Sequence, residues 1–213
     1  MKPLLVATTN PAKLDEYRLL LREYDLAPVS LGEAGVDDHG PEETGATFTE
    51  NALLKARFYF ARANLPTIAD DGGLMVDALG GEPGVRSHRW LGAGAAAAAH
   101  GDLDRALAEE VIRRMAGVEA ARRGARLRAA IALVYHEHGR IHERVSEAAL
   151  EGIIADRVWP RMRKGFPYRA VLFLADRGCY LGELSDEGAA RLSQRRTALE
   201  GLRGDLIQIA GSR

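Results

Sequence analysis

Over the first third of the chain, short apolar runs alternate with segments in which apolar residues recur at helical spacing. Residues 4–7 predict a buried strand that ends in a polar turn, and a helix is expected from Pro11, because apolar residues then recur at helical spacing. Residues 30–45 are polar and contain glycine, which is typical of a loop. A second helix is expected from Thr47 to about residue 63, and residues 66–69 predict the next short strand.

The rest of the chain changes from helical to β patterns and back. The expected elements are a glycine-rich loop (80–94), a low-complexity alanine run (95–99), an amphipathic helix (103–115), a hairpin (128–135 and 141–150, with its turn at 138–140), a second hairpin (171–181) and one helix (187–201). This order predicts an α/β fold in which helices flank a mixed sheet.

Composition narrows the class of protein. The 213 residues are 46% hydrophobic and 28% charged, as expected for one globular domain or two joined lobes. The formal net charge is -1, so no overall positive field attracts a nucleic acid polymer, although a small anion needs only a local positive site. One cysteine, Cys179, excludes an intrachain disulfide, and no apolar run reaches the roughly 20 residues of a membrane helix. With no visible signal peptide, a cytoplasmic location is expected.

Two adjacent acids stand before two glycines in the sequence Ile-Ala-Asp-Asp-Gly-Gly-Leu. We expect Asp70 and Asp71 to lie where the strand at residues 66–69 gives way to a flexible turn, with Gly72 and Gly73 letting a ligand approach the backbone. Carboxylates at such a place are oxygen ligands that suit Mg²⁺. Asp-Gly is also an ordinary turn signature, so Asp70 has an alternative role as a structural acid that caps the turn.

A second polar cluster lies between the first predicted strand and the first predicted helix. Thr8, Thr9 and Asn10 precede Pro11, and Lys13 follows within the first helical turn. The N–H groups and the dipole of a helix N-terminus favour an anion, and Lys13 adds a positive charge, so this segment is a candidate phosphate site without the glycines of a Walker loop. A helix N-cap beside a surface lysine is the alternative interpretation.

Two further clusters contain candidate residues. Asn51 and Lys55 are four residues apart and share one face of the second helix, and Glu42 on the preceding loop is a candidate metal ligand. In the second cluster, Phe166 or Tyr168 can stack on a base, and more distant basic residues can donate to a base or a phosphate. Three histidines flank the first predicted hairpin turn, and an exposed tip explains them better than a metal site: His136, His138 and His142.

Together these clusters resemble one known family, the inosine triphosphate pyrophosphatases, also called the Ham1 family. The matching text reads Thr-Thr-Asn-Pro-Ala-Lys, then Glu-Glu-Thr-Gly-Ala-Thr-Phe-Thr-Glu-Asn-Ala-Leu-Leu-Lys-Ala, then Ala-Asp-Asp-Gly-Gly-Leu-Met-Val-Asp-Ala-Leu-Gly-Gly. The resemblance covers nearly the whole chain and implies one domain over residues 1–213, an elongated mixed sheet in two lobes with a central cleft, and a homodimer. It also implies Mg²⁺-dependent hydrolysis of ITP, dITP and XTP to the monophosphate and pyrophosphate, which cleans the nucleotide pool.

The resemblance also assigns roles to residues. Glu42 and Asp71 resemble the metal-binding acids, Asp71 resembles the general base as well, and Lys13 resembles a catalytic lysine that offsets charge on the triphosphate. The residues that it implies for substrate binding are Thr8, Thr9, Asn10, Lys13, Lys55, Gly72, Phe166, Tyr168, Arg169, Gln194 and Arg195.

The C-terminal part departs from the family pattern at several base-reading positions. Residues 165–170 read Gly-Phe-Pro-Tyr-Arg-Ala where the family has Gly-Phe-Gly-Tyr-Asp-Pro, so Arg169 replaces an acid. Ala189 replaces a lysine, Gln194 replaces a histidine, and Gly72 replaces a serine. Because an aspartate accepts hydrogen bonds and an arginine only donates them, one hypothesis is that the base preference is shifted or broadened, with Arg169 either reading the base or turned outward.

Two other interpretations follow from the same residues. A non-catalytic nucleotide-binding relative is the main alternative, and the retained Glu42, Asp71 and Lys13 argue against it. The related Maf-type pyrophosphatases, which act on pyrimidine triphosphates, have serines and arginines where this chain has Thr9, Asn10 and Lys13, and are disfavoured.

Overall fold

The computed structural model describes residues 1–37, 39–92 and 102–211 of the chain. The alanine run predicted at residues 95–99 and the end of the predicted loop at 93–94 lie outside the described residues. The chain divides into two compact units. The first comprises Met1–Asp71, Ala129–Ala148 and Ala190–Arg213, and the second comprises Gly72–Arg128 and Ala149–Ala189. No helix in the described ranges is long and apolar enough to cross a membrane.

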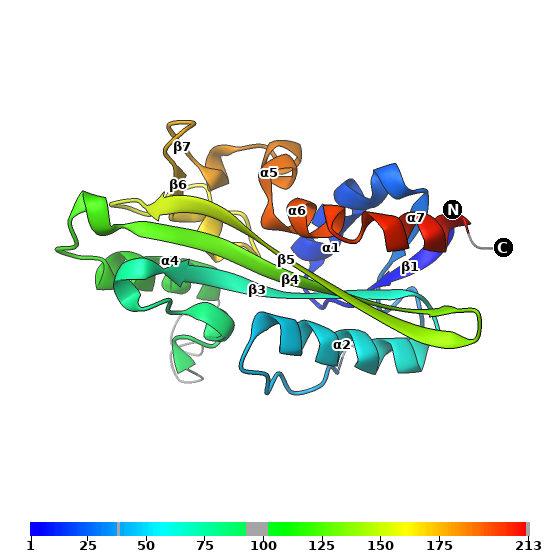
Figure 1. Ribbon diagram of the computed structural model, residues 1–213. Coiled ribbons are helices and arrows are strands. Elements are labelled where there is room, and N and C mark those ends of the chain that lie inside the picture. Colours follow the sequence, from blue (N-terminus) through cyan, green and yellow to red (C-terminus); the bar gives the residue numbers. More distant parts are fainter. Residues whose placement is uncertain (38, 93–101, 212–213) are drawn as a thin grey trace. The chain divides into compact units, whose positions relative to one another are not determined.

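A seven-stranded sheet forms the framework, and the sheet is mixed, as the sequence predicts (Figure 1). Its strands are β1 (Lys2–Val6), β2 (Leu26–Val29), β3 (Thr67–Val76), β4 (Gly124–Glu137), β5 (Arg140–Ile154), β6 (Leu172–Leu174) and β7 (Cys179–Tyr180). The strand order is β2-β1-β3-β4-β5-β6-β7. β1 is parallel to β2 and β3, whereas β6 is antiparallel to β5 and β7. The predicted α/β class is therefore confirmed.

Helices cover both faces of the sheet in the first unit. The α-helices of the described residues are α1 (Pro11–Leu20), α2 (Phe48–Ala63), α4 (Leu103–Arg114), α5 (Asp186–Leu192), α6 (Gln194–Glu200) and α7 (Arg203–Gly211). Figure 1 shows α1, α6 and α7 on one face and α2 on the other. α2 begins at Phe48, next to the predicted Thr47, because Thr47 and Glu50 form a capping box, in which each side chain accepts from the backbone N–H of the other.

A buried apolar core fixes α1 against the sheet in the first unit. Tyr17 and Leu20 of α1 pack in one cluster with alternate residues of β4, namely Ile131, Leu133 and Tyr135. Side chains of α6, of the turn after it and of α7 complete the same cluster: Ala198, Leu199, Leu202, Leu206 and Ile209. Because β1 also contributes to this core, the polar turn between β1 and α1 is held between two packed elements.

β3 is longer than the sequence predicts. The expected strand at residues 66–69 was to end in a flexible turn at the two acids, and this expectation was wrong, because β3 continues to Val76 with Asp70 and Asp71 in its middle. Successive side chains of a strand point to opposite faces, so the two neighbouring carboxylates enter different surroundings. Because the Asp70 and Asp71 carboxylates point to opposite faces of β3, each contacts a different set of side chains.

Gly73 lies within β3 and allows Gly84 and Ser87 to pack closely against the strand. A Cβ on Gly73 would lie 1.9 Å from Ser87 Oγ and 2.7 Å from the Gly84 carbonyl oxygen. Ser87 Oγ cannot easily move, because it accepts from the Leu74 N–H at 3.2 Å and donates to the Gly84 oxygen at 2.6 Å. Gly73→Ala should therefore lower the free energy of unfolding by about 1–3 kcal/mol, at the upper end of that range, as measured by urea denaturation.

The matched control for this substitution is Gly204→Ala in α7. An added Cβ there meets no atom within 4 Å, so the same chemical change should be neutral or should stabilise the helix by about 0.5–1 kcal/mol. Equal destabilisation by the two variants would contradict the packing argument.

The C-terminal segment also differs from its prediction. One helix over residues 187–201 was expected, and the structure instead has α5 and α6, separated at Ser193. Ser193 Oγ accepts from the Arg196 N–H at 3.2 Å and so begins a new helix. Among the described residues, an α-helix and a strand were also not predicted: α7, which follows Gly201, and β2, which contains Pro28 and lies at the edge of the sheet, where proline is tolerated.

Candidate active site

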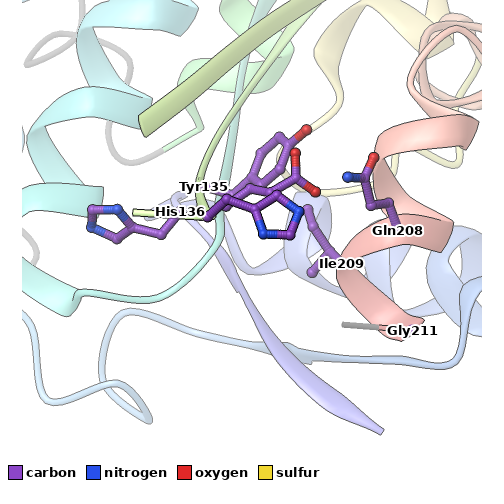
Figure 2. Close-up of a pocket in the computed structure, with 7 residues that line it drawn as sticks. Tyr135, His136, Gln208, Ile209 and Gly211 are labelled. Carbon is purple, nitrogen blue, oxygen red and sulfur yellow. The ribbon is translucent and has the colours of Figure 1, made fainter. Parts of the chain in front are cut away.

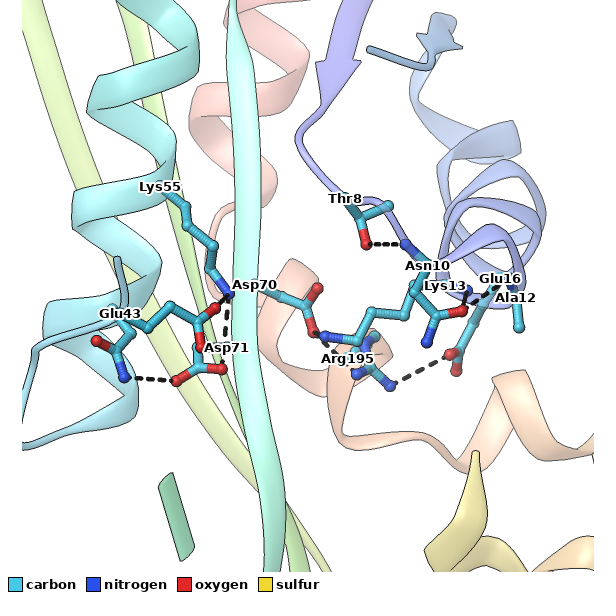
Figure 3. Close-up of polar contacts among 11 residues, drawn as sticks. Thr8, Asn10, Ala12, Lys13, Glu16, Glu43, Lys55, Asp70, Asp71 and Arg195 are labelled. Carbon is cyan, nitrogen blue, oxygen red and sulfur yellow. Dashed lines mark hydrogen bonds and ion pairs between the residues drawn. The ribbon is translucent and has the colours of Figure 1, made fainter. Parts of the chain in front are cut away.

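The turn between β1 and α1 is held by its own side chains. Asn10 is the N-cap of α1, and its Oδ1 accepts from the N–H groups of Ala12 at 3.0 Å and Lys13 at 3.4 Å. Thr8 Oγ1 accepts from the Asn10 N–H at 3.2 Å (Figure 3). Thr9 is exposed. The alternative of a helix N-cap is therefore correct for Asn10. A surface lysine is not, because Lys13 is buried.

Asp70 faces α1 and α6 and joins two cations. Lys13 Nζ lies 3.0 Å from Asp70 Oδ2, and Arg195 donates to the same oxygen through Nε at 2.9 Å and Nη2 at 2.8 Å. Arg195 Nη1 also donates to Glu16 Oε2 at 3.3 Å. The four buried side chains form a network of two cations and two anions, which we call the Asp70 network (Figure 3).

The charges of the Asp70 network shift the pKa values of its members. Burial raises the pKa of the Asp70 carboxyl, but Arg195 and Lys13 outweigh it and hold the pKa well below its usual value. Burial likewise lowers the pKa of Lys13, and Asp70 opposes this effect without cancelling it. Asp70 is therefore ionised at neutral pH.

Asp71 faces α2, on the other side of β3. Its Oδ2 accepts from Asn51 Nδ2 at 3.0 Å, and its Oδ1 lies 3.6 Å from Lys55 Nζ. Lys55 Nζ also donates to Glu43 Oε1 at 2.7 Å, and Asn51 Oδ1 accepts from the Gly45 N–H at 2.8 Å. Figure 3 shows β3 between this Asp71 cluster and the Asp70 network.

The surroundings of Asp71 favour a base. Burial raises the pKa of the Asp71 carboxyl, and the lysine and asparagine that contact it do not fully offset this effect. Burial lowers the pKa of Lys55, but Asp71 and Glu43 outweigh it, so its pKa is raised. Asp71 is thus more basic than an ordinary aspartate and is paired with a firmly protonated lysine, whereas Asp70 is a weak base.

The loop before α2 presents a different acid from the one predicted. Glu42 is exposed, and Glu43 is the glutamate whose carboxylate contacts Lys55 beside Asp71. The sequence offers no periodic signal within this loop that separates the two neighbouring acids. The metal-ligand role of Glu42 stays a prediction, and Glu43 joins it as a residue that the structure adds to the site.

The donor set fits a Mg²⁺ ion that is shared with phosphate. Glu43 and Asp71 meet at Lys55 Nζ, and Mg²⁺ is commonly bound by one or two carboxylates together with substrate phosphates. Across residues 1–37, 39–92 and 102–211, no group of three or more His, Cys, Asp or Glu side chains is placed to hold a metal alone. The site therefore fits a metal completed by substrate, and not an all-protein cage.

The predicted base-binding aromatics lie in the second unit. Tyr168 is buried and donates its hydroxyl to the Ser87 carbonyl oxygen at 2.6 Å, and burial raises its pKa. The Arg169 guanidinium lies over the Phe166 ring, 3.8 Å from its centroid, and Arg169 is buried. Arg169 is therefore not turned outward, and it covers one face of the ring proposed to stack on a base.

The remaining predicted residues occupy β3 and the start of α6. Gly72 is half-buried in β3. Gln194 and Arg195 open α6 and are both buried. The sequence suggests that Arg195 donates to a base or a phosphate, whereas in the structure its Nε, Nη1 and Nη2 groups donate to Asp70 and Glu16.

A separate pocket lies at the tip of the β4–β5 hairpin (Figure 2). It has a cavity volume of about 610 Å³ and is lined by Tyr135, His136, Glu137, His138, Gln208, Ile209 and Gly211. His138 and Gly139 form the turn at the predicted place, both with positive φ. The other two histidines contact rings: His136 with Phe60 and His142 with Tyr135. None of the residues of the Asp71 cluster lines this pocket.

The family model of the Ham1 family matches residues 4–204. A dITP/XTP pyrophosphatase of Xanthomonas campestris pv. campestris (strain 8004) is 39% identical over 206 residues, which are 97% of this chain and 98% of that protein. One of Symbiobacterium thermophilum is 42% identical over 200 residues, 93% and 91% of the two chains. The structure of a HAM1 protein from Coxiella burnetii is 30% identical, covers 98% of this chain and 100% of that one, and superposes with a TM-score of 0.78. The chain therefore belongs to the Ham1 family.

Proposed function

We propose that this chain hydrolyses non-standard purine nucleoside triphosphates, namely ITP, dITP and XTP, to the monophosphate and pyrophosphate. The observation that carries the proposal is Asp71, a buried carboxylate with a raised pKa that contacts Asn51 and Lys55. Relatives that match this chain over nearly their full length are named dITP/XTP pyrophosphatases, which supports the same substrates.

Each residue of the Asp71 cluster has a task in this reaction. Asp71 accepts a proton from a water molecule as the water oxygen attacks the α-phosphorus, and the bond from that phosphorus to the bridging oxygen breaks to release pyrophosphate. Asn51 orients the carboxylate, and Lys55 places a positive charge beside the reacting phosphates. Mg²⁺ supplies charge neutralisation at the phosphate oxygens when it is bound. Glu42, Glu43 and Asp71 are the residues that would hold it.

Thr8, Thr9 and Asn10 would line the triphosphate, with Lys13 offsetting its negative charge. The protein would act in the cytoplasm as a homodimer. Sedimentation at micromolar concentration tests the assembly, where a mass near the 23.1 kDa of one chain would contradict it.

The test of the function is pyrophosphate release by the purified chain with Mg²⁺, against ITP, dITP, XTP and the standard nucleoside triphosphates. Release concentrated on ITP, dITP and XTP, and abolished by EDTA, is the expected result. No release from any triphosphate would favour the non-catalytic nucleotide-binding alternative. Release that persists in EDTA would contradict the metal requirement.

A second candidate function, pyrophosphatase activity with a broadened base preference, is favoured by one observation. The Arg169 guanidinium, a donor of hydrogen bonds only, lies over the Phe166 ring, 3.8 Å from its centroid. If Arg169 sets the preference, Arg169→Asp should change the ratio of kcat/KM for ITP and ATP by about tenfold or more, because a reversed hydrogen-bonding edge discriminates strongly. Arg177→Asp, at an exposed turn after β6, is the matched charge reversal and should leave the ratio unchanged. An unchanged ratio in Arg169→Asp would reject this candidate.

A further inference from the structure

Three N–H groups converge on one oxygen of Asp70. Arg195 Nη2 and Nε lie 2.8 and 2.9 Å from Oδ2, and Lys13 Nζ lies 3.0 Å from the same atom. The other carboxylate oxygen, Oδ1, is buried and has no hydrogen-bond partner among the residues that the structure describes. Lys13 and Arg195 thus share a single acceptor, although a second acceptor is present on the same group.

Two cations, Lys13 and Arg195, neutralise the negative charge of Asp70. A buried carboxylate that loses its only cation is left with a large desolvation cost, which holds the cation in place. Here Arg195 keeps two contacts to Oδ2 even if Lys13 departs, and Glu16 anchors the other end of the guanidinium at 3.3 Å. The Lys13 ammonium can therefore leave Asp70 without stranding a buried negative charge.

We propose that Arg195 is a positioning residue that keeps Asp70 neutralised so that the Lys13 ammonium can turn from Asp70 to the phosphates of the substrate. This inference rests on the proposed function, because it assigns Lys13 to the phosphates. Arg195 itself does not touch the substrate. Its side chain is 6% exposed, and its Nε, Nη1 and Nη2 groups already donate to Asp70 and Glu16.

Without Arg195, Lys13 becomes the sole cation in contact with the buried Asp70 carboxylate and is held there. Arg195→Gln should therefore weaken the binding of inorganic tripolyphosphate, measured by calorimetry, by about tenfold or more, since releasing Lys13 would then expose an unpaired charge. The affinity for ITP should fall by the same factor. An arginine that reads the base would instead weaken ITP binding and leave tripolyphosphate, which has no base, unchanged. That outcome would overturn the proposal.

A second substitution tests the route through Asp70. Adding Asp70→Asn to Arg195→Gln removes the charge that traps Lys13, so most of the lost tripolyphosphate affinity should return. A double variant that binds as weakly as Arg195→Gln would show that Arg195 does not act through Asp70. Arg196→Gln, the neighbouring half-buried arginine of α6, is the matched control and should bind tripolyphosphate as the unaltered chain does.

Arg195→Lys keeps the test decisive if Arg195→Gln does not fold. A lysine retains a positive charge for Asp70, so tripolyphosphate affinity should stay within about threefold of the unaltered chain, since Asp70 remains compensated. A tenfold loss in this folded variant would reject the proposal. Tripolyphosphate binding requires no turnover, so a chain that binds it but releases no pyrophosphate from ITP would contradict the proposed function alone.

Discussion

Asp71→Asn should abolish pyrophosphate release, lowering kcat for ITP by about a thousandfold or more, because a positioned general base contributes about 10²–10⁴ and this carboxylate is also a proposed metal ligand. The substitution keeps the shape of the side chain, and an asparagine oxygen can still accept from Asn51 Nδ2, which donates to Asp71 at 3.0 Å. Binding of ITP to the variant should therefore remain measurable by calorimetry, with kcat falling far more than affinity.

The control for this prediction is Asp15→Asn, the same change at an exposed aspartate of α1 whose contact is a surface pair with Arg18. It should leave kcat and KM unchanged. Turnover that survives in Asp71→Asn would show that the base has been assigned to the wrong residue. Loss of turnover together with all ITP binding would mean that Asp71 acts in binding, and the role of base would then need another group.

The fold was predictable where local signals agree. Pro11 at the first turn, Asn10 as the cap and apolar residues at helical spacing all place α1, and the capping box of Thr47 and Glu50 places α2. The hairpin between β4 and β5 follows from a turn with positive φ at His138 and Gly139. In each of these segments, residues close together in the sequence determine the structure.

The predictions from the sequence were wrong where residues far apart in the chain determine the structure. Asp-Asp-Gly-Gly is a turn signature by itself, but β3 passes through it, because Lys13 and Arg195 neutralise one acid and Lys55 neutralises the other. These partners come from sites far along the chain, which no local pattern reveals. The missing Cβ of Gly73 serves the approach of Ser87 rather than a turn.

The sequence indicates which residues belong to the candidate site better than it indicates what each residue contacts there. Asn51 and Lys55 lie on one face of α2, as their spacing suggests, and both contact Asp71. The sequence does not show that Asp70 and Asp71 face opposite sides of β3, because the strand was expected to end before them. It also does not show that Arg195 is occupied by carboxylates, since those contacts join residues up to 179 positions apart.

Lys13→Met should lower kcat/KM for ITP by about 10²–10³, because removing one preorganised group that stabilises charge in the transition state typically costs that much. No other cation of the Asp70 network can replace it, since the Arg195 guanidinium is held between Asp70 and Glu16. Methionine preserves most of the length and volume of the lysine stem, so the packing of α1 against the core should survive. Urea denaturation separates any loss of stability from the loss of activity.

Arg18→Met, on the exposed side of the same helix, is the matched removal of a cation and should leave kcat/KM unchanged. Activity of Lys13→Met within about threefold of the unaltered chain would exclude Lys13 from the transition state, since a group that stabilises its charge contributes far more. Lys13→Met and Arg195→Gln can also be combined in one chain. If Arg195 acts only by freeing the Lys13 ammonium, adding Arg195→Gln to Lys13→Met should cause no further loss of tripolyphosphate binding. An additional loss would show that Arg195 reaches the phosphates by itself.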